Sequence, residues 1–234
     1  MKDLFVSMFG EPQGVVLFQL LFATQFTIYL SLIAFVGGGI VAACITVLRI
    51  MPAKTARFVA QCYIWFFQSA PLLMLLLLFG LGVPRLIGVE VNIWVAASLA
   101  LTLYSSAYLA EVWRGAIQSL PDGQWEGAEA LGLRFLQTLR LVILPQAFRV
   151  SIAPTVGFLV QIIKGTSLAY IIGFSDLMSI GKRWANAPVE GTEPFIIYPL
   201  MALIYFALCF PLSRLALRLE KRLGTVPKTA PVAA

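Results

Sequence analysis

Long apolar runs alternate with short polar segments along most of the chain. Five runs are long enough for membrane-spanning helices, which need ~20 residues to cross ~30 Å of hydrocarbon. They extend from Val15 or Phe22 to Leu48, and over about Phe58–Leu81, Val91–Val112, Ser151–Ile172 and Phe195–Leu212. Between them the pattern predicts a short turn at Gly82–Glu90 and a longer polar loop at Gly173–Pro194. We therefore expect an all-α polytopic membrane protein with five transmembrane helices.

The first two predicted spans contain residues that are unusual inside a helix. Small residues such as the Gly37–Gly39 run let a neighbouring helix come close, so we expect a packing role, with gating as the alternative. Pro71 bends the second span, and such breaks are tolerated where protein or a cavity satisfies the freed carbonyl. Gln61, Gln68 and Ser69 precede this break. We predict that they line a solute path or form interhelical hydrogen bonds.

Lys164 lies within the fourth predicted span. Its polar neighbours are Gln161, Thr166 and Ser167. A charged side chain inside a span costs roughly 2.5–3.5 kcal/mol on insertion scales, so it should face the helix bundle or reach the membrane surface. We predict that these four residues line a solute path or make interhelical contacts. We also expect Lys164 to pair with Glu111, with Asp176 or with a carboxylate of a partner protein.

The longest stretch that does not suit hydrocarbon is Glu111–Gly132, EVWRGAIQSLPDGQWEGAEALG. Glu111 and Arg114 are three residues apart and can form an ion pair on one helical face. A short helix is expected from about Pro121 to Leu131, because proline is accepted in a first turn and glycine at the position that ends a helix. This helix would lie between the third and fourth spans.

The surface of this short helix is mixed. Its apolar stripe consists of Trp125, Ala128 and Leu131 or Gly132. Glu126 and Glu129 flank the stripe, and acids beside small residues can anchor a basic partner that comes close. One interpretation is an amphipathic helix on the membrane surface; the other is a docking element for a soluble subunit. The mixed pattern of Arg134–Phe148 predicts a second interfacial helix that ends near Pro145.

Basic residues are distributed unequally between the two sides that five spans define. With the C-terminus inside, the inner side carries twelve Lys and Arg residues and the outer side four. The inner twelve are Arg49, Lys54, Arg57, Arg114, Arg134, Arg140, Arg149, Arg214, Arg218, Lys221, Arg222 and Lys228; the outer four are Lys2, Arg85, Lys182 and Arg183. Because cytoplasmic loops carry an excess of Lys and Arg, we expect the N-terminus outside, and the C-terminus and the short helix inside.

Composition agrees with a membrane protein and excludes several functions. Apolar residues make up 60% of the chain and charged residues 12%, against about 45–50% and 25% in soluble domains. Loop charges that set topology account for most of the net charge of +6, so we expect no nucleic-acid binding. The chain has no histidine, and Cys44, Cys62 and Cys209 have no metal-ligand spacing. We expect small buried cysteines and no metal site or catalytic dyad. No glycine-rich phosphate loop occurs, so we expect the chain neither to bind ATP nor to be an enzyme.

The segment AYLAEVWRGAIQSLPDGQWEGAEALG, followed by LPQAFR and by KGTSL at Lys164–Leu168, resembles the permeases of polar amino-acid uptake systems among the ABC importers. Glu126-Gly127-Ala128 with Gly132 resembles their EAA motif, the loop that docks onto the ATPase subunit. The resemblance covers about residues 20–220. It implies that the docking residues are Gly123, Gln124, Glu126, Gly127, Ala128, Glu129 and Gly132. The departures are Gly127 in place of the usual Ala, Gly165 in place of a frequent acid, and Gln68-Ser69-Ala70 before Pro71 in place of Arg-Gly-Thr.

The resemblance implies half of a translocation pathway for a polar amino acid, in a bacterial cytoplasmic (inner) membrane. Two ATP-binding subunits would use ATP and Mg, a second identical or homologous permease would complete the pathway, and an extracytoplasmic solute-binding protein would deliver the amino acid. We expect residues 1–14 to form a periplasmic segment, 15–222 the permease domain and 223–234 a disordered cytoplasmic tail. The alternative is a stand-alone secondary carrier or channel for small polar solutes. An intramembrane enzyme would need paired acids, a Ser/His pair or a metal set, and the chain shows no such spacing.

Overall fold

The computed structural model describes residues 2–223, and this part of the chain is helical without any strand. The helices are α1 (Lys2–Phe9), α2 (Gln13–Ile50), α3 (Lys54–Ser69), α4 (Leu72–Leu77), α5 (Val83–Ile87), α6 (Ile93–Gln118), α7 (Asp122–Ala130), α8 (Phe135–Thr138), α9 (Leu144–Thr166), α10 (Leu177–Ala185) and α11 (Pro194–Leu223). Within residues 2–223, four helical stretches can each cross a membrane by length and composition, and a bent pair gives a fifth when it is counted as one broken span. The predicted all-α, five-span fold is confirmed. Most of the predicted C-terminal tail, residues 224–234, lies outside the described residues.

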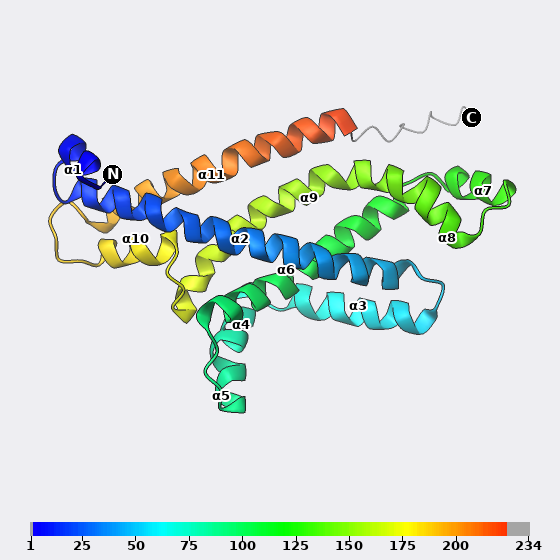
Figure 1. Cartoon of the computed structure of the whole chain (residues 1–234), viewed down its shortest axis with the longest axis horizontal. Helices are drawn as coiled ribbons and strands as arrows, with labels where there is room; N and C mark the ends of the chain where they lie inside the picture. Colours follow the sequence, from blue (N-terminus) through cyan, green and yellow to red (C-terminus); the bar gives the residue numbers. More distant parts are fainter. Residues whose placement is uncertain (1, 224–234) are drawn as a thin grey trace.

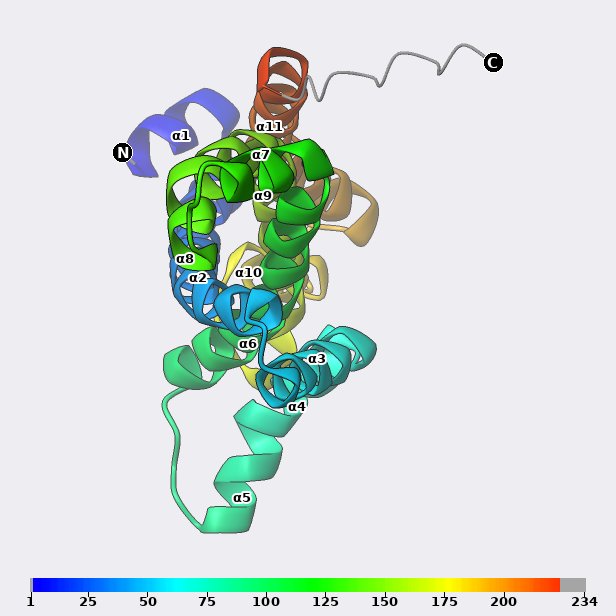
Figure 2. The same cartoon turned by 90° about the vertical axis from the view of Figure 1, so that its right-hand side faces the viewer.

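The long helices run roughly side by side along the longest axis of the molecule (Figure 1). Helices α7 and α8 lie at one end of this bundle, and α1 and α10 lie at the opposite end. Seen from the α7 end, α4 and α5 form an arm that leaves the bundle on the side of α3 (Figure 2). The short polar helix therefore sits where a partner outside the bundle can reach it.

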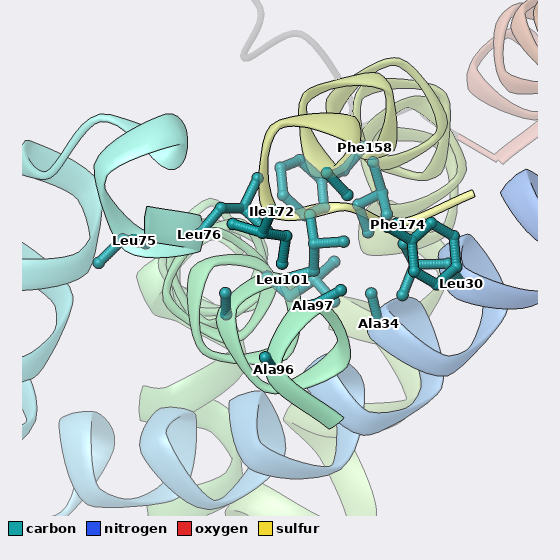
Figure 3. Close-up of a cluster of buried hydrophobic side chains, with 14 of the residues drawn as sticks. Leu30, Ala34, Leu75, Leu76, Ala96, Ala97, Leu101, Phe158, Ile172 and Phe174 are labelled. Atoms are coloured by element: carbon teal, nitrogen blue, oxygen red, sulfur yellow. The ribbon is translucent and has the colours of Figure 1, made fainter. Parts of the chain in front are cut away.

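The core lies where α2, α4, α6 and α9 meet, and it combines leucines with many alanines (Figure 3). Small residues allow α2 to pack closely on α6. A Cβ atom added to Gly38 would lie 2.7 Å from Ser105 Cβ, and one added to Gly37 would lie 3.0 Å from Thr102 Oγ1. These two glycines therefore serve the close α2–α6 contact, which is the predicted packing role.

The second predicted span is broken at Pro71, as the sequence predicted, so Phe58–Leu81 is not one continuous helix. Helix α3 ends at Ser69, Ala70 and Pro71 are extended, and the next helical stretch, Leu72–Ile87, is bent from α3 by 98°. Pro71 has no N–H for a helical hydrogen bond, and its ring restricts the residue before it. The turn predicted at Gly82–Glu90 starts later than expected, because a π-helical turn, Leu78–Gly82, and α5 extend the helix to Ile87.

The fourth predicted span begins earlier than expected. The predicted interfacial helix and the following span form one helical stretch, Phe135–Ile172, instead of separating near Pro145. A π-helical turn at Leu139–Ile143 comes just before Pro145, which lies in the first turn of α9. The wider turn and the position of Pro145 near the start of α9 let the chain pass this proline without ending the helix.

The predicted loop at Gly173–Pro194 contains a further helix, α10, which the sequence prediction missed. Asp176 caps it, since its Oδ1 accepts a hydrogen bond from Ser179 N at 2.9 Å. A capping aspartate before an apolar and basic helical pattern is a signal that could have identified it.

The prediction of three buried cysteines was wrong for Cys44 and Cys62, which are exposed. An apolar run on a span tolerates outward-facing small residues, because lipid can cover them.

Candidate docking and solute-path sites

Helix α7 is held on the end of the bundle by its apolar side chains. Trp125 is half-buried and packs against a cluster of Ile117, Leu120, Leu139, Ile143 and Ala147. Ala128 is buried, and Gln124 Oε1 accepts a hydrogen bond from Gln146 Nε2 at 2.8 Å. The helix that we predicted at Pro121–Leu131 is thus present at Asp122–Ala130.

The ends of α7 have the geometry that their residues favour. Pro121 precedes the first turn, and Gly132 has a φ of 77°, in the left-handed region that glycine tolerates best. The Leu133 N–H donates to Ala128 O at 3.1 Å and so satisfies a carbonyl of the last turn. One part of the predicted apolar stripe is wrong, because Leu131 is 82% exposed. Helix α7 ends at Ala130, so Leu131 no longer follows the helical face that packs on the bundle.

The remaining predicted docking residues on α7 form an exposed face. Gly123, Glu126, Gly127 and Glu129 are all exposed. A Cβ atom added to Gly123 or to Gly127 would meet nothing within 4 Å. No contact inside the described chain therefore requires glycine at these two positions. Within residues 2–223, neither glutamate takes part in an ion pair.

Glu111 is the centre of an ion cluster where α6 approaches α7. Its Oε2 lies 2.6 Å from Arg114 Nη2, the partner expected from the spacing. Its Oε1 lies 3.6 Å from Arg49 Nη2 at the end of α2, an interaction that the sequence analysis missed. The basic end of α2 and the acid of α6 lie on the same side of the predicted topology, which is the signal that could have suggested it. The cluster ties the end of α2 to the helix that leads into α7.

Lys164 does not pair with Glu111 or Asp176, so the prediction of a pair within the chain was wrong. Glu111 forms ion pairs with Arg49 and Arg114 instead, and the Asp176 carboxylate caps α10. Lys164 is instead exposed and lines an open cavity of about 280 Å³ between α9, α10 and α11. The other lining residues are Ser167, Met178, Tyr198, Met201, Ala202 and Tyr205. Ser167 Oγ donates to Lys164 O at 2.6 Å.

The other candidates for the solute path do not line this cavity. Gln161 is exposed one turn before Lys164, whereas Thr166 is buried and donates to Ile163 O at 2.7 Å. On α3, Gln68 Nε2 donates to Ala107 O at 3.3 Å, while Ser69 is exposed and Gln61 is half-buried. The Gln68 bond is the interhelical alternative that the sequence analysis left open. The direction in which each side chain points, and not its position along the chain, decides whether it is exposed, buried or bonded to another helix.

Asp176 is fully buried in the connection between α9 and α11. Burial raises the pKa of its carboxyl to about 6 from an ordinary value of 3.8, although backbone donors at the start of α10 favour the charged form. Its Oδ2 has no hydrogen-bond partner among the described residues. The Leu177 N–H beside it donates to Thr27 Oγ1 of α2 at 3.3 Å. The start of α10 is therefore fixed against α2, and its acid is poised to protonate at mildly acidic pH.

Comparisons with known proteins agree with this arrangement over most of the chain. Residues 35–225 match the family described as binding-protein-dependent transport system inner membrane component. The chain is 35% identical to the probable amino-acid ABC transporter permease protein YckA of Bacillus subtilis (strain 168), over 79% of this chain and 80% of that protein. It is 32% identical to the probable glutamine ABC transporter permease protein GlnM of the same organism, over 84% of this chain and 89% of that protein. A crystal structure of an amino acid ABC transporter with histidines superposes with a TM-score of 0.81 and 29% identity, over 88% of this chain and 94% of that one.

Proposed function

Because this chain belongs to the family of inner-membrane components of binding-protein-dependent transport systems, we propose that it is the permease subunit of an ATP-driven importer of amino acids. It forms half of a translocation pathway and docks an ATPase subunit through α7. A second identical or homologous permease completes the pathway. An extracytoplasmic solute-binding protein supplies the solute, in line with the family's description, and the relatives' names favour an amino acid as that solute. The N-terminus lies outside and α7 lies in the cytoplasm, where ATP is available.

The exposed face of α7 is the observation that carries the docking role. Gly123 and Gly127 have open space around them, so another backbone can approach where side chains would block it. Glu126 and Glu129 have no ion-pair partner within residues 2–223 and offer two carboxylates to a basic surface. Trp125 anchors the opposite side of α7 on the bundle. A force applied to α7 by a closing ATPase is therefore passed to α6 and to the start of α9, biasing the pathway between two states.

Co-purification tests the docking role. The chain is co-expressed with the ATP-binding subunits of its own organism's amino-acid importers, and the ATPase retained on a tag at the C-terminus of this chain is measured. Glu126→Lys is expected to lose most of the retained ATPase, because it places a cation on a basic partner. Glu220→Lys, an equally exposed charge reversal on α11, is the matched control and should change little. Gly127→Ala should be tolerated and Gly127→Leu should not. Equal retention by Glu126→Lys and by the control would contradict docking at α7.

The cavity beside Lys164 is the proposed contact for the amino acid. An ammonium at this depth is costly unless it meets an anion or water, and every amino acid carries an α-carboxylate. Ser167 and Tyr205 add hydroxyl groups, and Met178 and Met201 add adaptable apolar surface. The cavity of about 280 Å³ is lined by three helices, so relative motion of α9 and α11 changes its shape.

Uptake by reconstituted complexes tests this contact. Lys164→Met should raise the solute concentration needed for half-maximal uptake, whereas Lys164→Arg keeps the charge and should retain much of the affinity. Lys182→Met, a change of an exposed lysine on α10 outside the cavity, is the control. A Lys164→Met complex with unchanged solute dependence would contradict the contact. Vesicles that contain only this chain should transport nothing, and uptake by them would favour the carrier or channel alternative.

A further inference from the structure

A second and larger cavity lies near the α7 end of the bundle, between α2, α6 and the helical stretch that leads into α9. Its volume is about 550 Å³. The lining residues are Ala43, Thr46, Val47, Ile50, Trp113, Ile117, Leu139, Leu144, Ala147, Phe148, Ser151, Ile152, Thr155 and Val156. None of them is charged. Val47, Leu144 and Phe148 are 45%, 42% and 67% exposed, so apolar side chains surround an opening to the outside of this chain.

The polar groups of this cavity are already satisfied within the chain, which leaves an apolar interior. Trp113 Nε1 donates to Thr155 Oγ1 at 3.0 Å, and Ser151 Oγ donates to Phe148 O at 3.0 Å. Thr46 Oγ1 donates to Ala110 O at 3.4 Å. An apolar cavity without free polar partners does not hold water well and accepts an apolar guest instead.

Basic residues adjoin several of the lining residues in the sequence. Arg49 follows Leu48 and precedes the lining residue Ile50, Arg140 follows Leu139, and Arg149 follows Phe148. Arg140 and Arg149 are exposed, and neither lies in an ion pair of residues 2–223. The Arg49 Nε atom is buried without a hydrogen-bond partner. In the three helical walls Gln13–Ile50, Ile93–Gln118 and Phe135–Ile172, the single acid is Glu111.

We propose that this cavity binds one acyl chain of an anionic phospholipid, whose headgroup phosphate is held by Arg140 and Arg149. Apolar lining, an apolar mouth and neighbouring unpaired cations match the two halves of such a lipid. Basic pockets between membrane helices on the cytoplasmic side are known to hold anionic headgroups. The binding itself does not depend on the proposed transport role; only its assignment to the cytoplasmic leaflet uses the orientation given above.

The position of this lipid site makes it relevant to α7. Ile117, Leu139 and Ala147 line the cavity and also belong to the cluster on which Trp125 of α7 packs. An acyl chain in the cavity therefore supports the wall against which α7 rests. An empty cavity leaves that wall without packing on one side.

Quenching of Trp113 fluorescence tests the proposal, because Trp113 lines the cavity. The full chain, with its other tryptophans changed to Phe, is placed in nanodiscs that contain small mole fractions of a phospholipid brominated on its acyl chains. Brominated phosphatidylglycerol should reach half-maximal quenching at a lower mole fraction than brominated phosphatidylcholine. At about 1 kcal/mol per arginine near an anionic lipid, each arginine contributes a preference of about 5-fold. The other four tryptophans are Trp65, Trp94, Trp125 and Trp184.

Matched variants separate the acyl-chain and headgroup parts of the site. Ala43→Phe fills an exposed lining position and should reduce quenching, whereas Cys44→Phe at the next, non-lining position should not. The double variant Arg140→Gln/Arg149→Gln should lose the preference for the anionic lipid, and Arg218→Gln on α11 should keep it.

Three outcomes would overturn the proposal. They are equal quenching by both lipids, equal behaviour of Ala43→Phe and Cys44→Phe, and absence of quenching by either lipid, which would mean that no acyl chain enters the cavity. If the single-tryptophan chain does not fold, native mass spectrometry of the unaltered chain answers the same question. Phosphatidylglycerol retained by the parent chain and by Cys44→Phe, but lost from Ala43→Phe, supports the site, and equal retention by all three overturns it.

Discussion

Gly38→Ala is the sharpest test of the packing that holds α2 against α6. The added Cβ would lie 2.7 Å from Ser105 Cβ and 3.3 Å from Ser106 N and Thr102 O. Two of these three neighbours are backbone atoms, which cannot rotate away as the end of a long side chain can. Gly39→Ala is the matched control on the same helix, because its Cβ would meet only Trp113 Cη2 at 3.7 Å, an ordinary contact.

The size of the effect follows from these distances. Carbon atoms in contact prefer about 3.5–4.0 Å, so the 2.7 Å approach forces α2 and α6 apart locally by about 0.8–1.3 Å. Overpacking of this kind costs about 1–3 kcal/mol. Replacing glycine by alanine inside a helix also contributes about 1 kcal/mol of helix propensity, but both variants gain it and it cancels in their comparison. We therefore expect Gly38→Ala to be less stable than Gly39→Ala by about 1–3 kcal/mol.

Thermal unfolding of the purified protein in one detergent measures this difference. For a chain of this size, about 2–4 °C of midpoint shift corresponds to 1 kcal/mol. The Gly38→Ala midpoint should accordingly lie about 2–12 °C below that of Gly39→Ala. If both variants unfold at the same temperature, or if Gly38→Ala is the more stable one, α2 and α6 do not approach as closely as described and the packing argument is refuted.

Three further changes test other parts of the fold. Gly181→Ala would press a Cβ against the side chain of the buried Met201, whose thioether must leave its packed position, with a loss of up to about 1–3 kcal/mol in unfolding free energy. Glu111→Gln leaves both Arg49 and Arg114 without their carboxylate partner. It should therefore lower the thermal midpoint of the detergent-solubilised protein. Asp176→Asn keeps an amide that can cap α10. Because burial raises the pKa of Asp176 to about 6, the wild type should lose up to about 3 kcal/mol of stability as pH rises from 4 to 7, and the variant should not lose this contribution.

Controls make these three results interpretable. Gly115→Ala, on α6 with open space around it, should be tolerated, and an equal loss in both glycine variants would deny the tight α10–α11 contact. Glu90→Gln removes an exposed acid outside the cluster and should leave the midpoint unchanged. For Asp176, the measured quantity is the variant midpoint minus the wild-type midpoint at each pH. A difference that stays constant between pH 4 and 7 would contradict the raised pKa.

Local patterns were sufficient for the class of protein and for the position of the short helix α7. The apolar runs predict membrane spans because hydrocarbon selects side chains residue by residue, independently of which helices become neighbours. Pro121 and Gly132 predict the ends of α7 because their backbone restrictions are intrinsic to proline and glycine. The Glu111–Arg114 spacing predicts contact because it fits one turn of any helix.

Tertiary structure alone decided which polar side chains meet each other and which face a cavity. Lys164 and Gln68 lie in similar apolar surroundings in the sequence, yet one lines an open cavity and the other bonds to α6. Arg49 joined Glu111 because α2 ends beside α6, and the 98° bend at Pro71 followed from how α4 packs after the helix is interrupted. The physical reason is that periodicity assigns residues to a face of a helix, whereas the direction of that face depends on contacts between segments far apart in the chain.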